Sequence, residues 1–249
     1  MDEFESSDVR LDDRGAPVER GPRHGASEPL ERVLAAHCCH LPSGEVLVHE
    51  GDASAAVFCL LSGWLMVSKS MPDGSRQIVD FIMPYELFDP SSADGQTSAV
   101  QIEALTDMRV AVLPQTTWTR VETLDPKIRR LERITVAAAM VRRSERLLRI
   151  GRGSAENRIA YALIELCMRV SATDEQCNGQ FHLPLTQQLL GDFTGLSAVH
   201  VCRTLKRLGE KGLIQSEDSM DIRINDITAL AGVAGVDLTA LRRQIIAER

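Results

Sequence analysis

The chain has 249 residues, 44% of them hydrophobic and 25% charged, and its formal net charge is −7. This length suits one large domain or two of ordinary size. The absence of any run of about 18 apolar residues and the charged N-terminus argue against a membrane-spanning or secreted protein, so we expect a soluble cytoplasmic protein whose six scattered cysteines are reduced.

Residues 1–28 form a distinct N-terminal segment. They hold eight acidic residues and four arginines among Gly, Pro and Ser, with few large apolar side chains. Such a segment buries too little apolar surface to offset the entropy of ordering. We therefore expect a disordered acidic tail.

Residues 29–123 have the pattern of a β domain. Short apolar runs alternate with turn sequences such as Glu50-Gly51-Asp52 and Pro72-Asp73-Gly74. Alternation of this kind predicts antiparallel strands joined by tight turns. We expect a barrel or roll.

The run His37-Cys38-Cys39-His40 holds residue types that can ligate zinc, haem iron or an iron–sulfur cluster. Adjacent cysteines rarely direct both sulfurs at one metal, and only Cys59 offers a third sulfur nearby. We therefore interpret the run as the end of a short helix leading into the β domain, and we predict no cofactor of these kinds. The alternatives are a metal site at these four residues and reversible oxidation of a low-pKa thiol.

Residues 124–152 form one long helical pattern that follows Asp125-Pro126. Apolar residues alternate three and four positions apart, as in a coiled-coil seam, and a helix this long needs two covered faces. We predict a homodimer with this helix at its interface and a hinge at Gly151 to Gly153; burial within one subunit is the alternative. The predicted interface residues are Leu131, Ile134, Ala138, Val141 and Leu148.

Residues 153–236 combine two short helices with a hairpin. Thr186 and Ser197 are placed to cap helices over residues 187–193 and 197–211. Gly195 suits a left-handed turn between these helices. Two short strands around a polar turn follow at residues 213–224, which completes the pattern of a winged helix-turn-helix, and residues 237–249 are a C-terminal extension.

These motifs resemble the Crp/Fnr transcription regulators over about residues 30–235. The resemblance rests on Gln188-Leu-Leu-Gly191-Asp-Phe-Thr-Gly195-Leu-Ser197-Ala-Val-His200-Val-Cys-Arg203-Thr-Leu205, on Gly212-Leu-Ile, and upstream on Gly44-Glu45, Leu61-Ser62-Gly63 and Glu103-Ala-Leu-Thr-Asp107. It implies an α+β fold with an N-terminal antiparallel β-roll of the cyclic-nucleotide-binding type, a long dimerisation helix and a C-terminal winged helix-turn-helix. It also implies a homodimeric, sequence-specific regulator that binds double-stranded DNA at a near-palindromic operator and contacts RNA polymerase.

The resemblance also implies which residues touch DNA. Arg203 is the expected base contact, because an arginine fork fits guanine O6 and N7, and His200 is the second candidate. Ala198-Val199 replaces an acidic residue found in many members, so their operators do not transfer. Cys202 is expected to be packed. The full predicted DNA-binding set is Thr186, Gln188 and Ser197 at phosphate-contacting positions, with Ala198, His200, Arg203 and Lys206 on the second helix.

The ligand of the β-roll stays unassigned. Members that bind cyclic AMP carry a Gly-Glu pair and an Arg-Ser or Arg-Thr pair, whereas this chain reads Tyr85-Glu86-Leu87-Phe88-Asp89-Pro90 and then Gln96-Thr97-Ser98-Ala99. A buried phosphate without an arginine is costly, so cyclic AMP is not expected.

The sequence also bears on other classes of function. It lacks a Gly-rich phosphate loop, a metal-spaced His/Glu pair and a nucleophile elbow, so no enzyme is expected. Constitutive DNA binding without any ligand is one alternative. Another is a ligand-binding or thiol-redox module whose winged helix contacts protein, which would lack the steep salt dependence of DNA binding.

Overall fold

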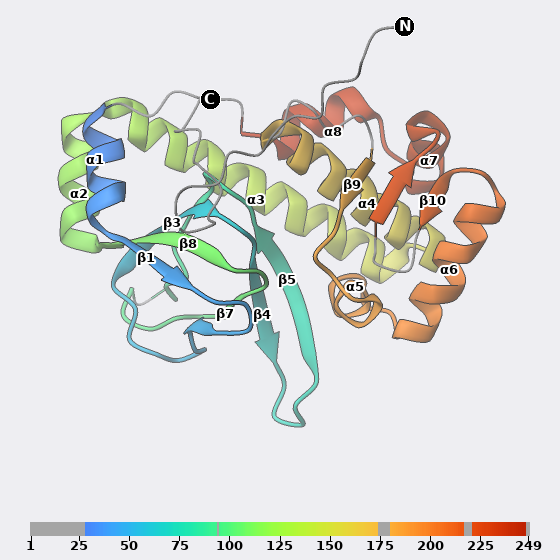
Figure 1. The fold of residues 1–249 in the computed structure, drawn as a ribbon, viewed down its shortest axis with the longest axis horizontal. Coiled ribbons are helices and arrows are strands. Elements are labelled where there is room, and N and C mark those ends of the chain that lie inside the picture. The colour runs from blue at the N-terminus through green and yellow to red at the C-terminus, as the bar shows by residue number, and fades with distance from the viewer. Residues whose placement is uncertain (1–27, 94, 174–179, 217–220, 248–249) are drawn as a thin grey trace, which may run out of the picture.

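The computed structural model describes residues 28–93, 95–173, 180–216 and 221–247, and Figure 1 shows their arrangement. The predicted acidic tail lies outside the described residues except for Glu28. A β-roll and a mainly helical C-terminal part lie at the two ends of one long helix. The predicted α+β fold is confirmed.

The β-roll consists of two four-stranded antiparallel sheets with the orders β1-β8-β3-β6 and β2-β7-β4-β5. Leu60, Leu65, Ile102 and Val110 are fully buried in the apolar core that these strands share. The elements are α1 (Glu28–Ala36), β1 (Cys38–Leu41), β2 (Val46–Val48), β3 (Ala56–Ser62), β4 (Leu65–Ser70), β5 (Arg76–Ile82), β6 (Leu87–Phe88), β7 (Gln101–Ala104) and β8 (Met108–Pro114).

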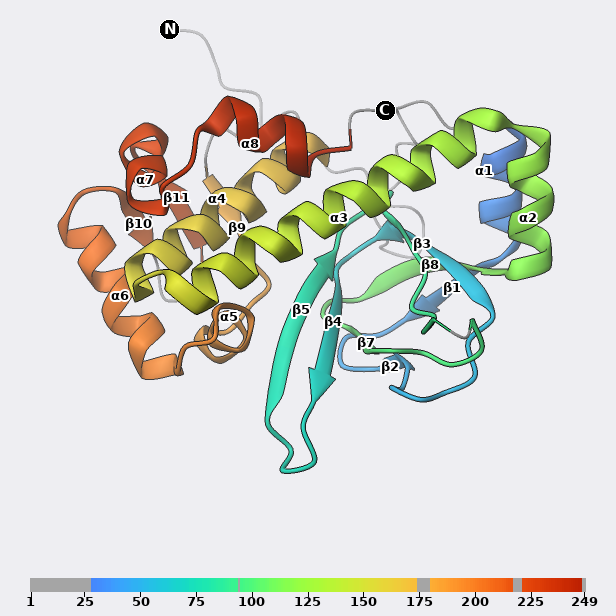
Figure 2. The ribbon, with the colours of Figure 1, turned by 180° about the vertical axis from the view of Figure 1, so that it is seen from behind.

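A tight turn at Gly63 joins β3 to β4. Gly63 has a φ of +83°, and a Cβ atom there would lie 2.5 Å from the carbonyl oxygen of Asp107. Only glycine fits this position, which explains the Leu61-Ser62-Gly63 motif. The next hairpin, β4–β5, is long and projects away from α3, with β5 on the side that faces the C-terminal part (Figures 1 and 2).

The helices α2 (Gln115–Leu124) and α3 (Pro126–Arg152) follow the β-roll. Asp125 caps α3 by accepting a hydrogen bond from the backbone N–H of Lys127 at 2.9 Å, and Pro126 occupies the first helical position. The helix then runs the length of the molecule (Figure 2). Its C-terminal half packs against α4, so α3 connects the two parts of the chain.

The C-terminal part is a winged helix extended by two helices. Its elements are α4 (Ala155–Thr173), β9 (Gln180–His182), α5 (Gln187–Thr194), α6 (Ala198–Glu210), β10 (Ile214–Ser216), β11 (Asp221–Ile224), α7 (Ile227–Ala234) and α8 (Leu238–Ile245). The wing has three strands in the order β10-β11-β9, because β9 adds to the two predicted from the sequence. In the C-terminal extension, Leu241 and Ile245 of α8 are buried.

Candidate nucleic-acid interface

Helices α5 and α6 are built as the sequence predicts. The Thr186 hydroxyl accepts a hydrogen bond from the N–H of Leu189 at 3.2 Å, and the Ser197 hydroxyl accepts one from His200 at 3.4 Å. Gly195 ends α5 in the left-handed conformation, with a φ of +67°. A Cβ atom on Gly191 would overlap the carbonyl oxygen of Leu196, so the two helices approach as closely as glycine allows.

Helix α6 has one buried and one exposed face. Val201, Leu205 and Leu208 are buried in the C-terminal core, whereas Arg203 and Lys206 are exposed. Within the described part of the chain, no hydrogen bond or ion pair engages the Arg203 guanidinium. Lys206 lies 4.0 Å from Glu210, one turn away, in an exposed pair that contributes little to stability. Both cations are therefore available to an external partner.

The predicted phosphate-contacting residues gather at the N-terminal ends of α5 and α6. Thr186, Gln188 and Ser197 are all exposed there, where free backbone N–H groups and the helix dipole favour an anion. His200 folds back over this end, with Nδ1 lying 3.0 Å from the Ser197 hydroxyl. Ala198 and His200 both belong to the first turn of α6.

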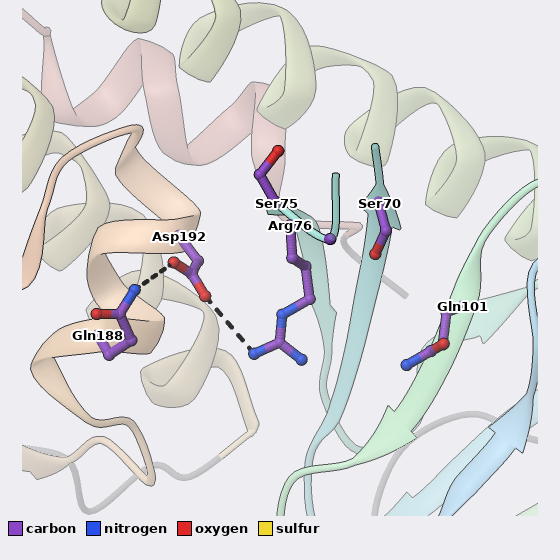
Figure 3. Close-up of a pocket in the computed structure, with 7 residues that line it drawn as sticks. Ser70, Ser75, Arg76, Gln101, Gln188 and Asp192 are labelled. Carbon is purple, nitrogen blue, oxygen red and sulfur yellow. Dashed lines mark hydrogen bonds and ion pairs between the residues drawn. The ribbon is translucent and has the colours of Figure 1, made fainter. Parts of the chain in front are cut away.

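One acidic residue, Asp192, lies beside this surface and is neutralised by the β-roll. Gln188 donates a hydrogen bond to Oδ1 of Asp192 at 2.8 Å, and Arg76 from β5 lies 3.6 Å from Oδ2 (Figure 3). A second ion pair, at 3.4 Å, holds Arg76 to Glu103. The open polar groove in the figure is lined by Ser70, Gly74, Ser75, Arg76, Gln101, Gln188 and Asp192.

Cys202 corrects an expectation, because its thiol is exposed and not packed. A helix advances 100° per residue, so the buried positions Val201 and Leu205 place Cys202 on the outer face of α6 beside Arg203. The position of Cys202 on the helix determines its exposure more strongly than the general tendency of cysteine to be buried. The helical pattern of the sequence already contained the signal.

The residues that α3 exposes differ from the predicted dimer interface. Ala138 is buried against its own chain, Val141 packs on the C-terminal core and Leu131 packs beside α1 and α2. Of the predicted seam, Leu148 is 57% exposed and Ile134 is partly buried. The uncovered apolar stripe of α3 is made of Val136, Met140, Leu147 and Leu148.

The basic residues of α3 are not a uniformly solvated face. Arg142, Arg146 and Arg149 are each buried, and their guanidinium groups pair with acids or backbone carbonyls of the same chain. These three arginines are therefore unavailable for the long-range attraction to DNA that a basic helix could provide.

The prediction that the run His37-Cys38-Cys39-His40 ends a helix is wrong. Helix α1 ends at Ala36, and Cys38, Cys39 and His40 belong to β1, which pairs with β8. Successive strand residues face opposite sides, so the two thiols point apart. Burial raises the pKa of both thiols. Among the described residues there is no group of three His, Cys, Asp or Glu side chains that could hold a metal ion.

The segment from Tyr85 to Ala99, which stands where cyclic-AMP-binding members carry their ligand residues, makes contacts within this chain. Tyr85 has a φ of +67°, a conformation that favours glycine, and the Glu86 carboxylate accepts a hydrogen bond from Arg169 of α4 at 2.7 Å. The following loop bonds to itself, with the hydroxyls of Ser92 and Thr97 3.0 Å apart. Glu86 is thus turned toward α4.

Two family models match the chain. Residues 38–122 match the cyclic nucleotide-binding domain, and residues 157–233 match the Crp-like helix-turn-helix domain. The first match covers most of the β-roll, and the second covers α5, α6 and the wing. In the described ranges, no helix is both long and apolar enough to cross a membrane.

Curated relatives and solved structures agree with these matches. The transcriptional activator protein FnrA of Stutzerimonas stutzeri is 31% identical over 196 residues, which are 78% of this chain and 79% of that protein. The nitrogen fixation regulation protein FixK of Rhizobium meliloti is 28% identical over 75% of this chain and 82% of its own. The structure of FixK2 from Bradyrhizobium japonicum has a TM-score of 0.71 at 22% identity and covers 80% of this chain and 98% of that one.

Proposed function

Because this chain belongs to the Crp/Fnr family of transcription regulators, which are not enzymes, we propose that it reads a near-palindromic operator as a homodimer. The observation that carries the proposal is the Arg203 side chain, exposed and unengaged within the described residues on the outer face of α6. An arginine fork in the major groove can donate to guanine O6 and N7 together. Arg203 therefore supplies the principal base contact.

The neighbouring residues of α6 define the rest of the reading surface. His200 lies one turn nearer the N-terminus and is the second base-reading residue. Ala198 gives an apolar contact, of the kind that suits a thymine methyl group. Lys206 is exposed further along the helix and contacts the DNA backbone.

Three residues position the helix without reading sequence. Thr186, Gln188 and Ser197 bind phosphates on either side of the groove, using a hydroxyl, an amide and the free N–H groups at the helix ends. The pairing of Asp192 with Arg76 supports this role, because an unpaired carboxylate beside Gln188 would repel the DNA backbone.

The dimer forms along the uncovered stripe of α3. Val136, Met140 and Leu147 are 61%, 70% and 71% exposed, and their spacing of four and seven residues keeps them on one face. Two such stripes pack as a coiled-coil seam. Leu148 of the predicted seam, 57% exposed, lies beside this face, whereas Ile134 is partly buried and Leu131, Ala138 and Val141 pack within the subunit.

A regulator of this kind works where its DNA and RNA polymerase are, in the cytoplasm. It acts without a metal, haem, iron–sulfur cluster or cyclic AMP, in line with the strand geometry of Cys38 and Cys39 and with the engagement of Glu86 by Arg169. The signal that reaches the β-roll is a different one, or the protein is controlled by its abundance.

Selection from a random duplex pool, followed by affinity measurements at several salt concentrations, tests the function. The selected site should have two half-sites about one helical turn, or roughly 34 Å, apart. Affinity should fall steeply with salt as counterions are released. If no sequence is enriched and the affinity does not depend on salt, the winged helix contacts protein instead.

The role of Arg203 is tested with Arg203→Ala. Sequence-specific affinity should be lost, while the dimer mass in light scattering should not change. Arg243→Ala removes the same charge from an exposed position on a different helix, α8, and serves as the matched control. Equal operator affinity in the two variants would contradict the assignment.

A further inference from the structure

A buried cluster of six charged residues lies where the β-roll meets the C-terminal part. Three carboxylates face three buried guanidinium groups, and the exposed guanidinium of Arg143 lies 3.8 Å from one of these carboxylates, Asp80. The β-roll contributes two acids, and α3 and α4 contribute the rest. We call this group the junction cluster: Asp80 of β5, Glu86 next to β6, Arg142 and Arg146 of α3, and Glu165 and Arg169 of α4.

Asp80 is the centre of the junction cluster. Its carboxylate is fully buried, with the guanidinium nitrogens of Arg142, Arg146 and Arg169 at 3.4, 3.3 and 3.2 Å. Burial opposes its charge, yet the three guanidinium groups hold the pKa of Asp80 well below its usual range. Ion pairs of Asp80 thus connect β5 to α3 and α4.

The other two carboxylates complete the connections. Glu165 is fully buried and accepts a hydrogen bond from Arg146 at 2.5 Å, which joins α4 to α3. Glu86 accepts one from Arg169 at 2.7 Å, which joins α4 to the β-roll. Arg142 also donates to the backbone carbonyl of Ile245 in α8 at 3.2 Å. The junction cluster therefore joins the β-roll to α3, α4 and α8.

The same strand also holds the first helix of the helix-turn-helix. Gln77 of β5 donates its side-chain amide to the carbonyls of Asp192 and Phe193, near the C-terminal end of α5. Phe81 of β5 packs on Phe193, with ring centroids 4.8 Å apart. Contacts at both ends of β5 therefore fix the C-terminal part against the β-roll.

A buried cluster of ion pairs contributes less to stability than an apolar contact but is more specific in geometry. Burying ions costs desolvation energy, so such clusters add little stability over a packed apolar contact. They do require one geometry, because each guanidinium must meet its carboxylate. The arrangement that they fix here leaves His200, Arg203 and Lys206 exposed, so it does not cover the reading surface.

We propose that the junction cluster, with Asp80 as its main positioning residue, fixes the orientation of α6 relative to α3 and thereby the separation of the two recognition helices in the dimer. This inference rests on the proposed dimeric function. Correct separation lets the second half-site bind as an intramolecular event, at high effective concentration. Loss of the cluster should therefore weaken binding to a two-half-site operator and spare binding to a single half-site.

The experiment compares these two DNA lengths. Asp80→Asn should lower the affinity for the selected full operator by at least about tenfold, because the gain from joining two sites depends on geometry. Affinity for a duplex with one half-site should stay within about twofold, since one helix-turn-helix suffices there. Glu45→Gln, on an exposed carboxylate of the β-roll, is the matched control and should change neither value.

Folding is checked by circular dichroism and dimer mass by light scattering. If Asp80→Asn fails to fold, Glu86→Gln decides, because Glu86 belongs to the junction cluster and its side chain is only partly buried, at 18% exposure. Equal loss on both DNA lengths in a folded dimer, or no loss on either, would overturn the role of the junction cluster. If the wild-type protein selects no site, the proposed function fails instead.

A second measurement does not need an operator. Spin labels on the exposed thiol of Cys202 in each subunit report the distance between the two recognition helices, after serine replaces Cys38, Cys39 and Cys177. The wild-type distance should be narrowly distributed near roughly 34 Å. Asp80→Asn should broaden it. An unchanged distribution in a folded dimer would show that the junction cluster does not position α6.

Discussion

Gly191 of α5 packs directly on the backbone carbonyl of Leu196, and Leu196 returns a hydrogen bond from its N–H to the carbonyl of Gly191 at 3.0 Å. No side chain fits between these two residues, so the crossing of α5 and α6 depends on a glycine. We predict that Gly191→Ala lowers the free energy of unfolding by about 1–3 kcal/mol, because the helices must separate to admit a methyl group. Urea denaturation measures the loss.

Gly232→Ala is the matched control for this change. Gly232 lies inside α7, and a Cβ atom there would meet nothing within 4 Å. Alanine is the better helix former, so this variant should be more stable by about 0.4–1 kcal/mol. Operator affinity should fall for Gly191→Ala only. Equal stability of the two variants would show that the helix crossing tolerates a side chain.

The helix-turn-helix could be predicted because its determinants are local. Thr186 and Ser197 cap helices that begin at the next residue, and Gly195 supplies the left-handed turn between them. Each of these effects involves residues a few positions apart, which a sequence displays directly. The alternation of strands and turns in the β-roll was equally visible.

The orientation of α3 could not be predicted in the same way. Its periodicity shows two apolar faces but not which of them meets the β-roll. Arginines normally mark the solvated face, yet Arg142 and Arg146 are buried because Asp80 and Glu165, 62 and 19 residues away respectively, neutralise them. The predicted seam was therefore placed partly on the inward face, at Ala138 and Val141. Such long-range charge pairing leaves no local pattern.

The strand at Cys38 to Leu41 was missed for a related reason. Cys39 lies opposite Val110 in the sheet, so the element exists through a pairing with a distant strand. Its own residues include two cysteines and a histidine, and we interpreted them as the end of a short helix. Strand preference depends strongly on the neighbouring strand, which a short run of sequence does not contain.

The stripe on α3 gives a prediction about assembly. Met140→Glu and Leu147→Glu should each convert the dimer to a monomer, because a carboxylate would be desolvated and placed beside its symmetry mate. Light scattering measures the mass. Met71→Glu introduces the same charge at another exposed apolar side chain, beside the β4–β5 turn, and should leave the dimer intact. A dimeric Met140→Glu protein would exclude this stripe as the interface.

The exposed thiol of Cys202 offers a direct test of how the protein lies on DNA. Cys202 is next to Arg203 on the outer face of α6, so bound operator should shield it from a maleimide reagent. In a background where serine replaces Cys38, Cys39 and Cys177, we expect the labelling rate of Cys202 to fall in proportion to the fraction of protein bound. An unrelated duplex of equal length should give no protection at salt concentrations where only the operator binds, and Arg203→Ala should lose it. Full labelling at saturating operator would place α6 away from the DNA.

Glu132 gives a prediction about pH. Burial, together with the neighbouring Glu122 and Asp89, raises the pKa of Glu132 from 4.5 to about 7, and Trp118 donates a hydrogen bond to its carboxylate at 3.2 Å. A carboxyl whose pKa is higher in the folded state binds its proton more tightly there, so it contributes stability below pH 4.5. That contribution is lost as the pH rises through about 7.

Glu132→Gln should abolish this pH dependence, since the amide stays neutral and can still accept the Trp118 hydrogen bond. Urea denaturation midpoints of the two proteins should therefore diverge from pH 5 to pH 8, with the variant more stable at the higher pH. In a Trp64→Phe background, Trp118 fluorescence of the native protein should titrate near pH 7, and the Glu132→Gln protein should show no such transition. Parallel midpoints across this range would show that Glu132 is already ionised at pH 5. Its pKa would then not be raised by burial, Glu122 and Asp89.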